Sequence, residues 1–271
     1  MAPVPDPAAG LAGRTALAIF AHPDDESLAC GGTLARLADR GVRVVLMCAS
    51  RGERGSLSDP ALVPPGSSLA AVRANELREA ARVLGAAEVI ILDHPDGNIR
   101  WNRVAEFHAE IVNAIETYTP DVVITFDEDG LYWHFDHVGV HERTHTAVKS
   151  FGDAAPPLYY VTLPHGAMRA VVEAAIAMGW VPPGSGFWAI TPDAFGLAAE
   201  PPSLTVDVSA WVTRKLAALC CHRTQMGSTN PFDLIDQAEA RRWLGCERFR
   251  RSEISSGESI LDTIGEQVLS L

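Results

Sequence analysis

The stretch Thr15 to Phe20 (TALAIF), followed directly by Ala21-His22-Pro23-Asp24-Asp25-Glu26, decides the fold. The apolar half predicts a buried strand, and the small residues after Glu26 predict the start of a helix. One imidazole and two adjacent carboxylates therefore lie at the exit of a buried strand, which is where open α/β sheets place ligands and chemistry. A His and an Asp three residues apart can reach one cation, and the neighbouring Asp stays free to act on a water molecule.

A second polar cluster, Tyr132-Trp133-His134-Phe135-Asp136-His137, follows the apolar run Val122 to Phe126 and an acidic turn. Two strands of one parallel sheet would deliver both clusters to the same edge. Two imidazoles and one carboxylate from distant segments form a familiar catalytic zinc set, with a fourth position open for water.

Strand-like and helical stretches alternate along the first 163 residues. We predict strands over 15–21, 42–48, 88–92, 121–126 and 158–162, and helices over 31–40, 69–84, 103–118 and 137–149. This alternation is typical of an α/β protein, Rossmann-like, with a mostly parallel sheet flanked by helices.

The chain of 271 residues is long enough for one large domain, which we divide into four parts. We expect a loose tail over 1–13 and a catalytic α/β core over 14–163. Proline and aromatic residues over 164–203 indicate an irregular, lid-like segment with one short helix, 167–178. Over 204–271 we expect a closing strand, 204–208, and helices over 212–223 and 232–243.

Composition narrows the function. The 22 basic and 34 acidic residues give a net charge of −12, which disfavours nucleic-acid binding. The five cysteines form no Cys-x-x-Cys motif, so we expect reduced, mostly buried thiols in a cytoplasmic protein. We find no signal peptide and no apolar run near the ~20 residues of a membrane span, and we leave a homo-oligomer as an open option. Serine-hydrolase elbows, Walker loops and dinucleotide fingerprints are absent from the sequence.

The motifs His-Pro-Asp-Asp-Glu at 22–26 and His-x-Asp-His at 134–137 resemble those of the LmbE-like or PIG-L-like de-N-acetylases. These are zinc hydrolases that remove acetyl from N-acetylglucosamine-type amides. The resemblance covers roughly the first 160 residues, including Ser50-Arg51-Gly52-Glu53 and Arg73-x-x-Glu76. Phe135 departs from the family, where many members carry Pro, and this indicates altered loop rigidity or a different pocket wall.

The resemblance implies His22, Asp25 and His137 as metal ligands. Zinc is the default metal for such a set, and ferrous iron is also compatible with it. The alternative is that these residues are ordinary loop residues or helix caps. His141 competes with His137, but the Glu of a His-Glu-x-x-His motif is missing, so we interpret His141 as structural or supporting and His145 as a surface residue.

We expect Asp24 to be the general base, with helix N-capping as its alternative role. The family positions suggest that His134 and Tyr132 stabilise the oxyanion and protonate the leaving amine, although a Tyr at this place can also be a packing residue. Asp136 is expected to orient an imidazole. Glu26 is expected to cap the helix or brace the loop.

Four residues are predicted substrate contacts. Arg73 and Glu76 match family positions that approach the sugar hydroxyls, with a solvated charge pair as the alternative. Arg51, beside Ser50, lies at the end of the second predicted strand. Asp96 belongs to His94-Pro95-Asp96-Gly97, which repeats part of the first motif but lacks the second Asp and is not predicted to bind metal.

The sequence therefore predicts a metal-dependent hydrolase that removes acetyl from an N-acetylglucosaminyl group of a small-molecule glycoconjugate. The aromatic residues of 164–202 favour a natural product such as a glycopeptide antibiotic. A thiol-cofactor (mycothiol-type) pathway deacetylase or conjugate amidase is the alternative enzyme. A non-catalytic metal- or carbohydrate-binding protein is the alternative of another class, and the presence of Asp24 and His134 speaks against it.

Overall fold

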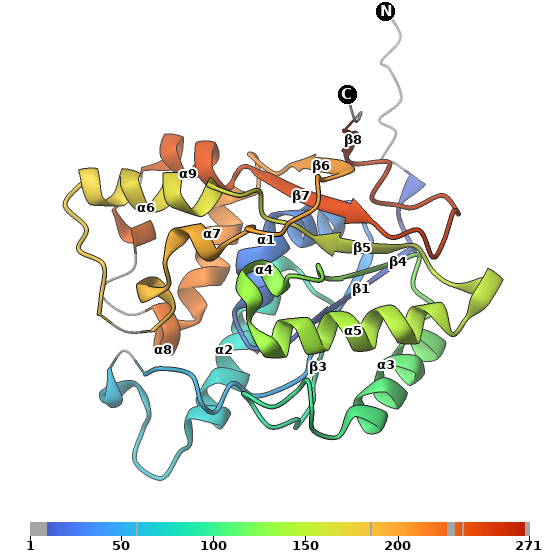
Figure 1. Ribbon diagram of the computed structural model, residues 1–271, viewed down its shortest axis with the longest axis horizontal. Helices are drawn as coiled ribbons and strands as arrows, with labels where there is room; N and C mark the ends of the chain where they lie inside the picture. Colours follow the sequence, from blue (N-terminus) through green and yellow to red (C-terminus); the bar gives the residue numbers. More distant parts are fainter. Residues whose placement is uncertain (1–9, 58, 185, 227–230, 235, 269–271) are drawn as a thin grey trace, which may run out of the picture.

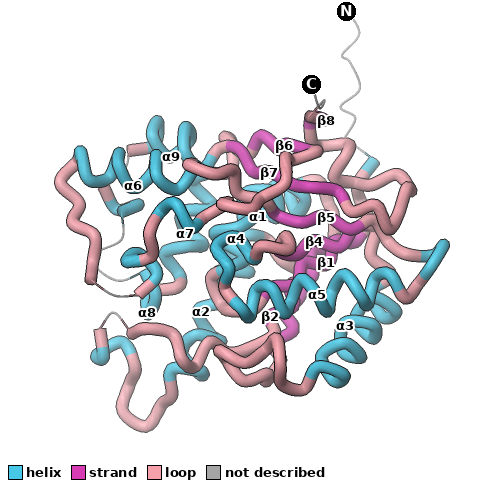
Figure 2. Tube along the Cα trace, in the orientation of Figure 1, coloured by secondary structure: helices cyan, strands magenta, loops and turns pink. Residues whose placement is uncertain are grey.

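The computed structural model describes residues 10–57, 59–184, 186–226, 231–234 and 236–268. Its centre is an eight-stranded sheet of order β3-β2-β1-β4-β5-β7-β6-β8 (Figures 1 and 2). The strands are β1 (Thr15–Phe20), β2 (Arg43–Cys48), β3 (Glu88–Ile91), β4 (Val122–Phe126), β5 (Leu158–Val161), β6 (Leu204–Asp207), β7 (Cys246–Arg251) and β8 (Glu266–Gln267). Strands β1 to β5 pair in parallel, which confirms the predicted mostly parallel α/β sheet.

The direction of winding reverses between β1 and β4. From β1 the chain winds outward through β2 to β3, then returns to place β4 on the other side of β1. Every residue of β1 and β4 is buried, as expected for parallel strands covered on both faces. A crevice at the carboxyl ends of β1 and β4 is the usual ligand site of such sheets, and both polar clusters follow these two strands.

Helices cover both faces of the sheet (Figure 1). On one face α1 (Asp25–Asp39), α2 (Leu69–Leu84) and α7 (Val212–Cys221) pack against one another. On the other face α3 (Val104–Tyr118) packs against α5 (Phe135–Lys149). The remaining helices are α4 (Gly130–Trp133), α6 (Ala167–Ala177), α8 (Arg223–Met226) and α9 (Gln237–Leu244).

The C-terminal part differs from the prediction. Strand β7 was not predicted, yet it pairs antiparallel with both β5 and β6 and joins the C-terminal part to the main sheet. Its sequence, CERFRR, is mostly charged, and only Glu247 and Phe249 are buried, so it lacks an apolar strand pattern. The helix expected over 232–243 begins instead at Gln237, because the Asp236 carboxylate accepts the amides of Ala238 and Glu239 as an N-cap.

The N-terminal expectation is partly wrong. Residues 1–9 of the predicted loose tail lie outside the described residues. Leu11 is 4% exposed and belongs to the main hydrophobic core, and the Gly13 amide donates to the Gly41 carbonyl. The expectation of mostly buried cysteines is also wrong, because only Cys30 and Cys48 of the five free thiols are buried. Within the described ranges, every helix is too short or too polar to cross a lipid bilayer.

The segment over 164–203 contains helix α6, as predicted, and two short 3₁₀ turns at Phe187–Ala189 and Pro192–Ala194. Together with α7 and α9 it builds a second hydrophobic cluster. In Figure 1 α6, α7, α8 and α9 gather at one end of the molecule. This cluster forms one wall of the crevice described below.

A buried ion pair ties β7 to α7, and hydrogen bonds to the same carboxylate tie β7 to α1. Lys215 Nζ lies 2.6 Å from Glu247 Oε1, and the Glu247 carboxylate also accepts the amides of Gly32 and Thr33, at 2.9 and 2.7 Å. Those amides are available because Cys30, with φ −147° and ψ 24°, interrupts the helical backbone of α1. Glu247 therefore satisfies two helix donors and one buried cation at once.

We expect Glu247→Ala to lower the free energy of unfolding by about 3–5 kcal/mol, because it leaves a buried ammonium and two amides unpaired. Urea unfolding followed by circular dichroism measures this change, and Glu253→Ala, at an exposed position, is the matched control. Equal losses for the two variants would show that the buried pair contributes nothing.

Candidate active site

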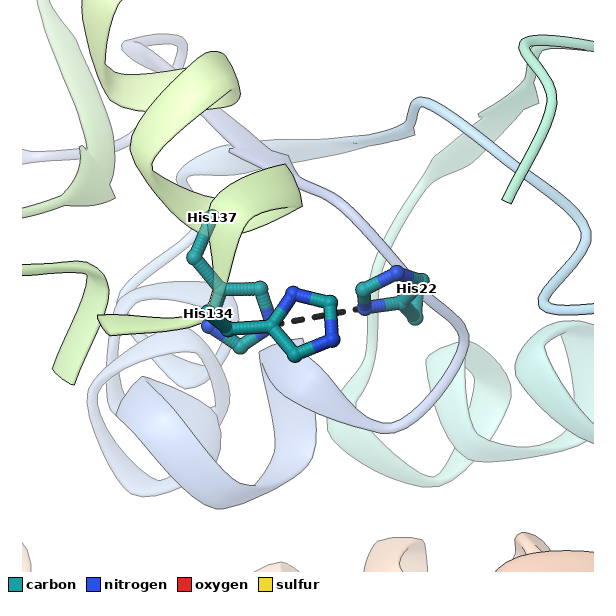
Figure 3. A group of neighbouring side chains, drawn as sticks. All are labelled: His22, His134 and His137. Atoms are coloured by element: carbon teal, nitrogen blue, oxygen red, sulfur yellow. Dashed lines mark hydrogen bonds between the residues drawn. The ribbon is translucent and has the colours of Figure 1, made fainter. Parts of the chain in front are cut away.

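The two polar clusters meet at the predicted edge of the sheet. His22 follows β1, Asp25 is the first residue of α1, and His134 and His137 lie at the start of α5. Figure 3 shows the three imidazoles converging from these separate segments, with a dashed line between His22 and His137. His22, Asp25 and His137 are all buried.

The three predicted metal ligands form a compact triangle. His22 Nδ1 lies 3.3 Å from His137 Nε2 and 3.4 Å from an Asp25 carboxylate oxygen, and His137 Nε2 lies 3.2 Å from the other Asp25 oxygen. A tetrahedral zinc with ligand bonds of about 2.0–2.1 Å needs neighbouring ligand atoms about 3.3–3.4 Å apart. The spacing therefore fits a tetrahedral cation with three protein ligands.

Hydrogen bonds on the outer side of each ring fix the inward-facing nitrogens. His22 Nε2 lies 3.2 Å from both Asp136 Oδ2 and Asp96 Oδ1, and His137 Nδ1 lies 3.1 Å from the Gly130 carbonyl oxygen. Each outer nitrogen therefore carries the proton, which leaves a lone pair on His22 Nδ1 and on His137 Nε2. This carboxylate–histidine arrangement is typical of metal centres.

The charge balance also suits a cation. Burial alone lowers the pKa of His22, but its contacts with Asp136, Asp25 and Asp96 outweigh burial and raise that pKa well above 6.5. Burial raises the pKa of Asp25, but the neighbouring His137 and His22 bring it well below 3.8. Two facing lone pairs beside an ionised carboxylate need a proton or a metal ion between them, and the donor set fits zinc or ferrous iron.

Asp24 lies beside this triangle and is held by its neighbours. Its φ of 127° is a strained value for a residue with a side chain, and such strain gathers at functional sites. The Glu26 carboxylate accepts the Asp24 amide at 3.0 Å, and Arg73 donates to Asp24 Oδ2 at 3.1 Å and to the Pro23 carbonyl. Asp24 occupies the N-cap position of α1 without a side-chain capping bond, so its carboxylate is not used in capping the helix.

The pKa of Asp24 is raised to about 6, mainly by burial and also by Asp25, while Arg73 opposes the rise. A carboxylate with such a pKa can accept and return a proton near neutral pH. This position and this pKa suit the general-base role predicted for Asp24.

His134 is oriented as a neutral hydrogen-bond donor. Its Nδ1 accepts the Asp136 amide at 3.3 Å as the N-cap of α5, which leaves the Nε2 proton for the cavity. Burial, followed by the nearby His137 and His22, lowers the pKa of His134 to about 4. The pKa of Tyr132 is raised well above 10 by burial and by Asp25, so its hydroxyl stays protonated. Both residues line the cavity as potential oxyanion donors.

The loop before α5 needs an unusual backbone. Gly130 has a φ of 54°, and a Cβ there would lie 2.8 Å from the His137 Cβ. Leu131 and Trp133 also have positive φ. Phe135, the departure from the family motif, is 57% exposed and packs edge-on against Trp101. Phe135 therefore does not form the pocket wall that the sequence suggested as one option.

A cavity of about 260 Å³ opens above these residues. One side is polar and the other is apolar. The polar lining comprises Asp24, Arg54, Ser56, Arg73, Asp96 and Gln225, and the apolar lining comprises Leu28, Phe187, Trp188, Ile190, Leu219, Met226 and Phe232. The apolar side comes mainly from the segment over 164–203 and from the second hydrophobic cluster.

Two predicted substrate contacts are placed elsewhere. Glu76 is 1% exposed and accepts the amide and hydroxyl of Thr224, so it joins α2 to α8 and lies outside the cavity lining. Arg51 forms an ion pair with Asp93 at 2.9 Å on the surface. The sequence could not show the structural role of Glu76, because its partner Thr224 is 148 residues away.

Arg73 and Asp96 do line the cavity, but each also has a structural partner. Arg73 holds the loop that carries Asp24. Asp96 accepts the Arg54 amide and contacts His22, and although burial opposes the change, His22 lowers its pKa to about 2. His145, expected at the surface, is partly buried and bonded to the Tyr160 hydroxyl at 2.7 Å.

Sequence reasoning missed His222. This buried side chain lies at the end of α7, and its Nε2 is 2.9 Å from Glu26 Oε1. Because Glu26 accepts the Asp24 amide, the pair braces the strained backbone of the predicted base. Nothing in the local sequence Cys220-Cys221-His222 signals this contact across 196 residues.

The His222–Glu26 pair makes stability depend on pH. Burial opposes the shift, but Glu26 raises the pKa of His222 above 6.5, and His222 correspondingly lowers that of Glu26 below 4.5. The histidine's contribution is complete below pH 6.5 and is lost as pH rises through its raised pKa; the contribution of Glu26 is lost as pH falls below 4.5.

We therefore expect His222→Ala to reduce the free energy of unfolding more at pH 5.5 than at pH 9. Urea titrations at the two pH values measure the difference, with the exposed His165→Ala as control. A loss independent of pH would rule out the charged pair.

The sheet is doubly wound, and the His/Asp triangle and the neighbouring Asp24 carboxylate lie where its winding reverses. These features define the class as an α/β enzyme with a candidate hydrolytic metal site. Residues 17–148 match the sequence profile of the PIG-L family, described as GlcNAc-PI de-N-acetylase. The 1D-myo-inositol 2-acetamido-2-deoxy-alpha-D-glucopyranoside deacetylase of Acidothermus cellulolyticus is 31% identical over 258 residues, covering 87% of this chain and 88% of that protein. The chain belongs to the PIG-L, or LmbE-like, family of GlcNAc deacetylases, as the two motifs predicted.

Solved structures share the fold. The 4-carboxy-2-hydroxymuconate hydratase GalB of Pseudomonas putida KT2440 matches with a TM-score of 0.62 at 18% identity, covering 91% of this chain and 99% of that one. A deacetylase of the teicoplanin biosynthesis pathway matches with a TM-score of 0.60 at 17% identity, covering 89% and 99%. A hydratase and a deacetylase on one fold show that the reaction must be argued from the site.

Proposed function

We propose that this protein is a zinc-dependent deacetylase that hydrolyses the acetamide of an N-acetylglucosaminyl group linked to a small polyol such as inositol. The observation that carries the proposal is the triangle of His22, Asp25 and His137, with ligand atoms 3.2–3.4 Å apart and the Asp24 carboxylate beside it. Ferrous iron suits the same donors, so the restoration experiment below includes both metals.

A zinc ion held by His22, Asp25 and His137 would polarise the amide carbonyl and make a water molecule more acidic. Asp24 takes the proton of the attacking water, while Arg73 holds its carboxylate and Glu26 holds its backbone amide. His134 Nε2–H and the Tyr132 hydroxyl donate to the oxyanion of the tetrahedral intermediate. His134 is neutral at pH 7. We therefore assign to Asp24, and not to His134, the step that returns the proton to the departing amine. The products are acetate and a free glucosamine amine.

The choice of substrate departs from the first interpretation of the sequence. That interpretation preferred a glycopeptide antibiotic, but the relative that is 31% identical is named for an inositol-linked sugar, which favours the thiol-cofactor-type alternative. The polar side of the cavity, with Arg54, Ser56 and Gln225, suits sugar and polyol hydroxyls. A volume of about 260 Å³ suits a compact conjugate.

A glycopeptide remains the second candidate because Phe187, Trp188 and Phe232 form an apolar wall beside the polar side. The likeness to the teicoplanin-pathway deacetylase is one of fold and does not decide the substrate.

The test is amine release from three N-acetylated substrates: glucosaminyl-inositol, free glucosamine and a glycopeptide pseudoaglycone carrying the sugar. The protein is assayed as purified, after chelation, and after addition of zinc or ferrous iron. We expect metal-restored activity that is highest on the inositol conjugate. Activity highest on the glycopeptide would favour the second candidate, and no activity on any of the three with stoichiometric metal would overturn the deacetylase proposal.

A further inference from the structure

A second cavity, of about 100 Å³, lies on the other side of the candidate metal ligands. Asp25 lines both cavities, whereas His137 lines the second one. Leu28, Tyr132 and Phe187 also border both, so the two cavities meet beside the ligand triangle.

The second cavity is mainly apolar. Its far wall is formed by Leu163 at the end of β5, by Met168 and Val171 of α6, by Phe195 and by Leu244 of α9. These residues, Leu163 excepted, are buried, and they belong to or pack against the second hydrophobic cluster.

Two of the charged groups at its border are already paired. Lys215 and Glu247 bind each other at 2.6 Å, and Glu247 also accepts two amides of α1. The buried Thr162 hydroxyl and the Trp243 indole N–H have no hydrogen-bond partner within the described part of the chain. These two neutral groups can each bind a water molecule, and the rest of the lining is mainly apolar.

The geometry of an amide explains why two cavities should meet at the triangle. The carbonyl carbon that is attacked carries two substituents, the nitrogen of the sugar and the acyl chain, which point in different directions. The larger cavity holds Asp24 and the polar side chains that suit the sugar. The walls of the smaller one are mainly apolar, Lys215 and Glu247 at its border are paired with each other, and Arg248 is partly exposed, which suits a hydrocarbon chain.

We propose that the second cavity is an acyl subsite and that the protein hydrolyses glucosaminyl amides with acyl chains longer than acetyl, up to about four carbons. The inference rests on the proposed deacetylase function. Water supplies the hydroxyl of the released carboxylic acid and the proton of the released amine, and the C–N bond breaks. The limit of four carbons follows from the cavity volume. An apolar cavity of about 150 Å³ holds the six carbons of benzene, so one of about 100 Å³ holds about four.

Burial of each additional methylene should tighten binding about fourfold, so butyryl, with two more methylenes, should bind roughly fifteenfold more tightly than acetyl. Octanoyl exceeds the cavity and should lose that gain. The preference should therefore peak at an intermediate chain length.

The experiment measures binding of N-acetyl-, N-butyryl- and N-octanoyl-glucosaminyl-inositol by calorimetry to the zinc-loaded Asp24→Asn variant, in which ligands are not consumed. Val171→Phe fills the cavity from α6, and Ile176→Phe, at an exposed position of the same helix, is the matched control. We expect Val171→Phe to weaken butyryl binding about fifteenfold and acetyl binding less than twofold, with no change for Ile176→Phe.

Butyryl binding no tighter than acetyl binding would overturn the acyl subsite, and so would a butyryl preference that survives in Val171→Phe. Should Val171→Phe fail to fold, Met168→Trp fills the same cavity. The comparison of butyryl with acetyl binding needs only the protein without a cavity-filling substitution. A separate assay of amine release from the acetyl compound by the wild-type protein tests the deacetylase function. Failure of that assay is thus distinguishable from failure of the binding series.

Discussion

Asp24→Asn should reduce the turnover number for amine release by about 10²–10⁴-fold while the protein still binds one zinc per chain. The carboxamide cannot take the proton of the attacking water, and general-base catalysis contributes a factor of this size. It keeps the shape of the side chain, and the proposed metal ligands Asp25 and His22 are untouched. Steady-state kinetics together with metal analysis measure both quantities.

Asp153→Asn, at an exposed position far along the chain, is the matched control and should behave as the wild type. Loss of zinc together with activity would show that Asp24 serves the metal centre. Turnover within threefold of the wild type would exclude it as the base.

The same variant separates an enzyme from a binding protein. A non-catalytic metal- or carbohydrate-binding protein would have no turnover to lose, and its affinity for the glycoconjugate would be unchanged. In the enzyme, kcat/KM of the wild type should also fall as pH drops through the pKa of Asp24. Without metal that pKa is raised to about 6, mainly by burial, and a bound dication lowers it, so the fall should lie at or below pH 6.

His22→Ala should abolish both zinc binding and activity. The variant removes one corner of the 3.2–3.4 Å triangle and also leaves Asp96 and Asp136 without the imidazole that both contact. Three ligands are the usual minimum of a catalytic zinc site, so two should not retain the metal after dialysis against a chelator. Metal content and amine release are measured on the dialysed protein before and after zinc addition.

His165→Ala removes an exposed histidine and should leave zinc content and activity unchanged. Wild-type protein should lose activity on chelation and regain it with zinc. Full activity of His22→Ala without bound metal would overturn the metal-dependent mechanism.

Much of the fold followed from local patterns. The continuous apolar runs that became β1, β2 and β4 are the mark of strands buried on both faces, and Gly85 ends α2 in the left-handed conformation. The order of strands and right-handed crossovers then place the loops after β1 and β4 at one edge. For this reason the residues of the two motifs could be predicted to meet.

The prediction failed where distant segments supply the partner. Glu76 has the same sequence context whether it faces a sugar or Thr224, and only the packing of α8 decides. Strand β7 is charged along most of its length, so its place between β5 and β6 has no apolar signature. The start of α1 at Asp25, earlier than the expected Gly31, brings Asp25 and Glu26 into the first helical turn.

The sequence by itself determined the parallel core, the family and the set of imidazoles and carboxylates, because strand periodicity and motif spacing are local properties of the chain. Tertiary structure alone decided the tautomer of His22, the bracing of Asp24 by the Glu26–His222 pair, and the apolar cavity behind the ligands. Each of these depends on contacts between segments more than a hundred residues apart or on the volume left between packed helices. Such distances and volumes are defined only when the chain has folded, so they cannot be read from the order of residues.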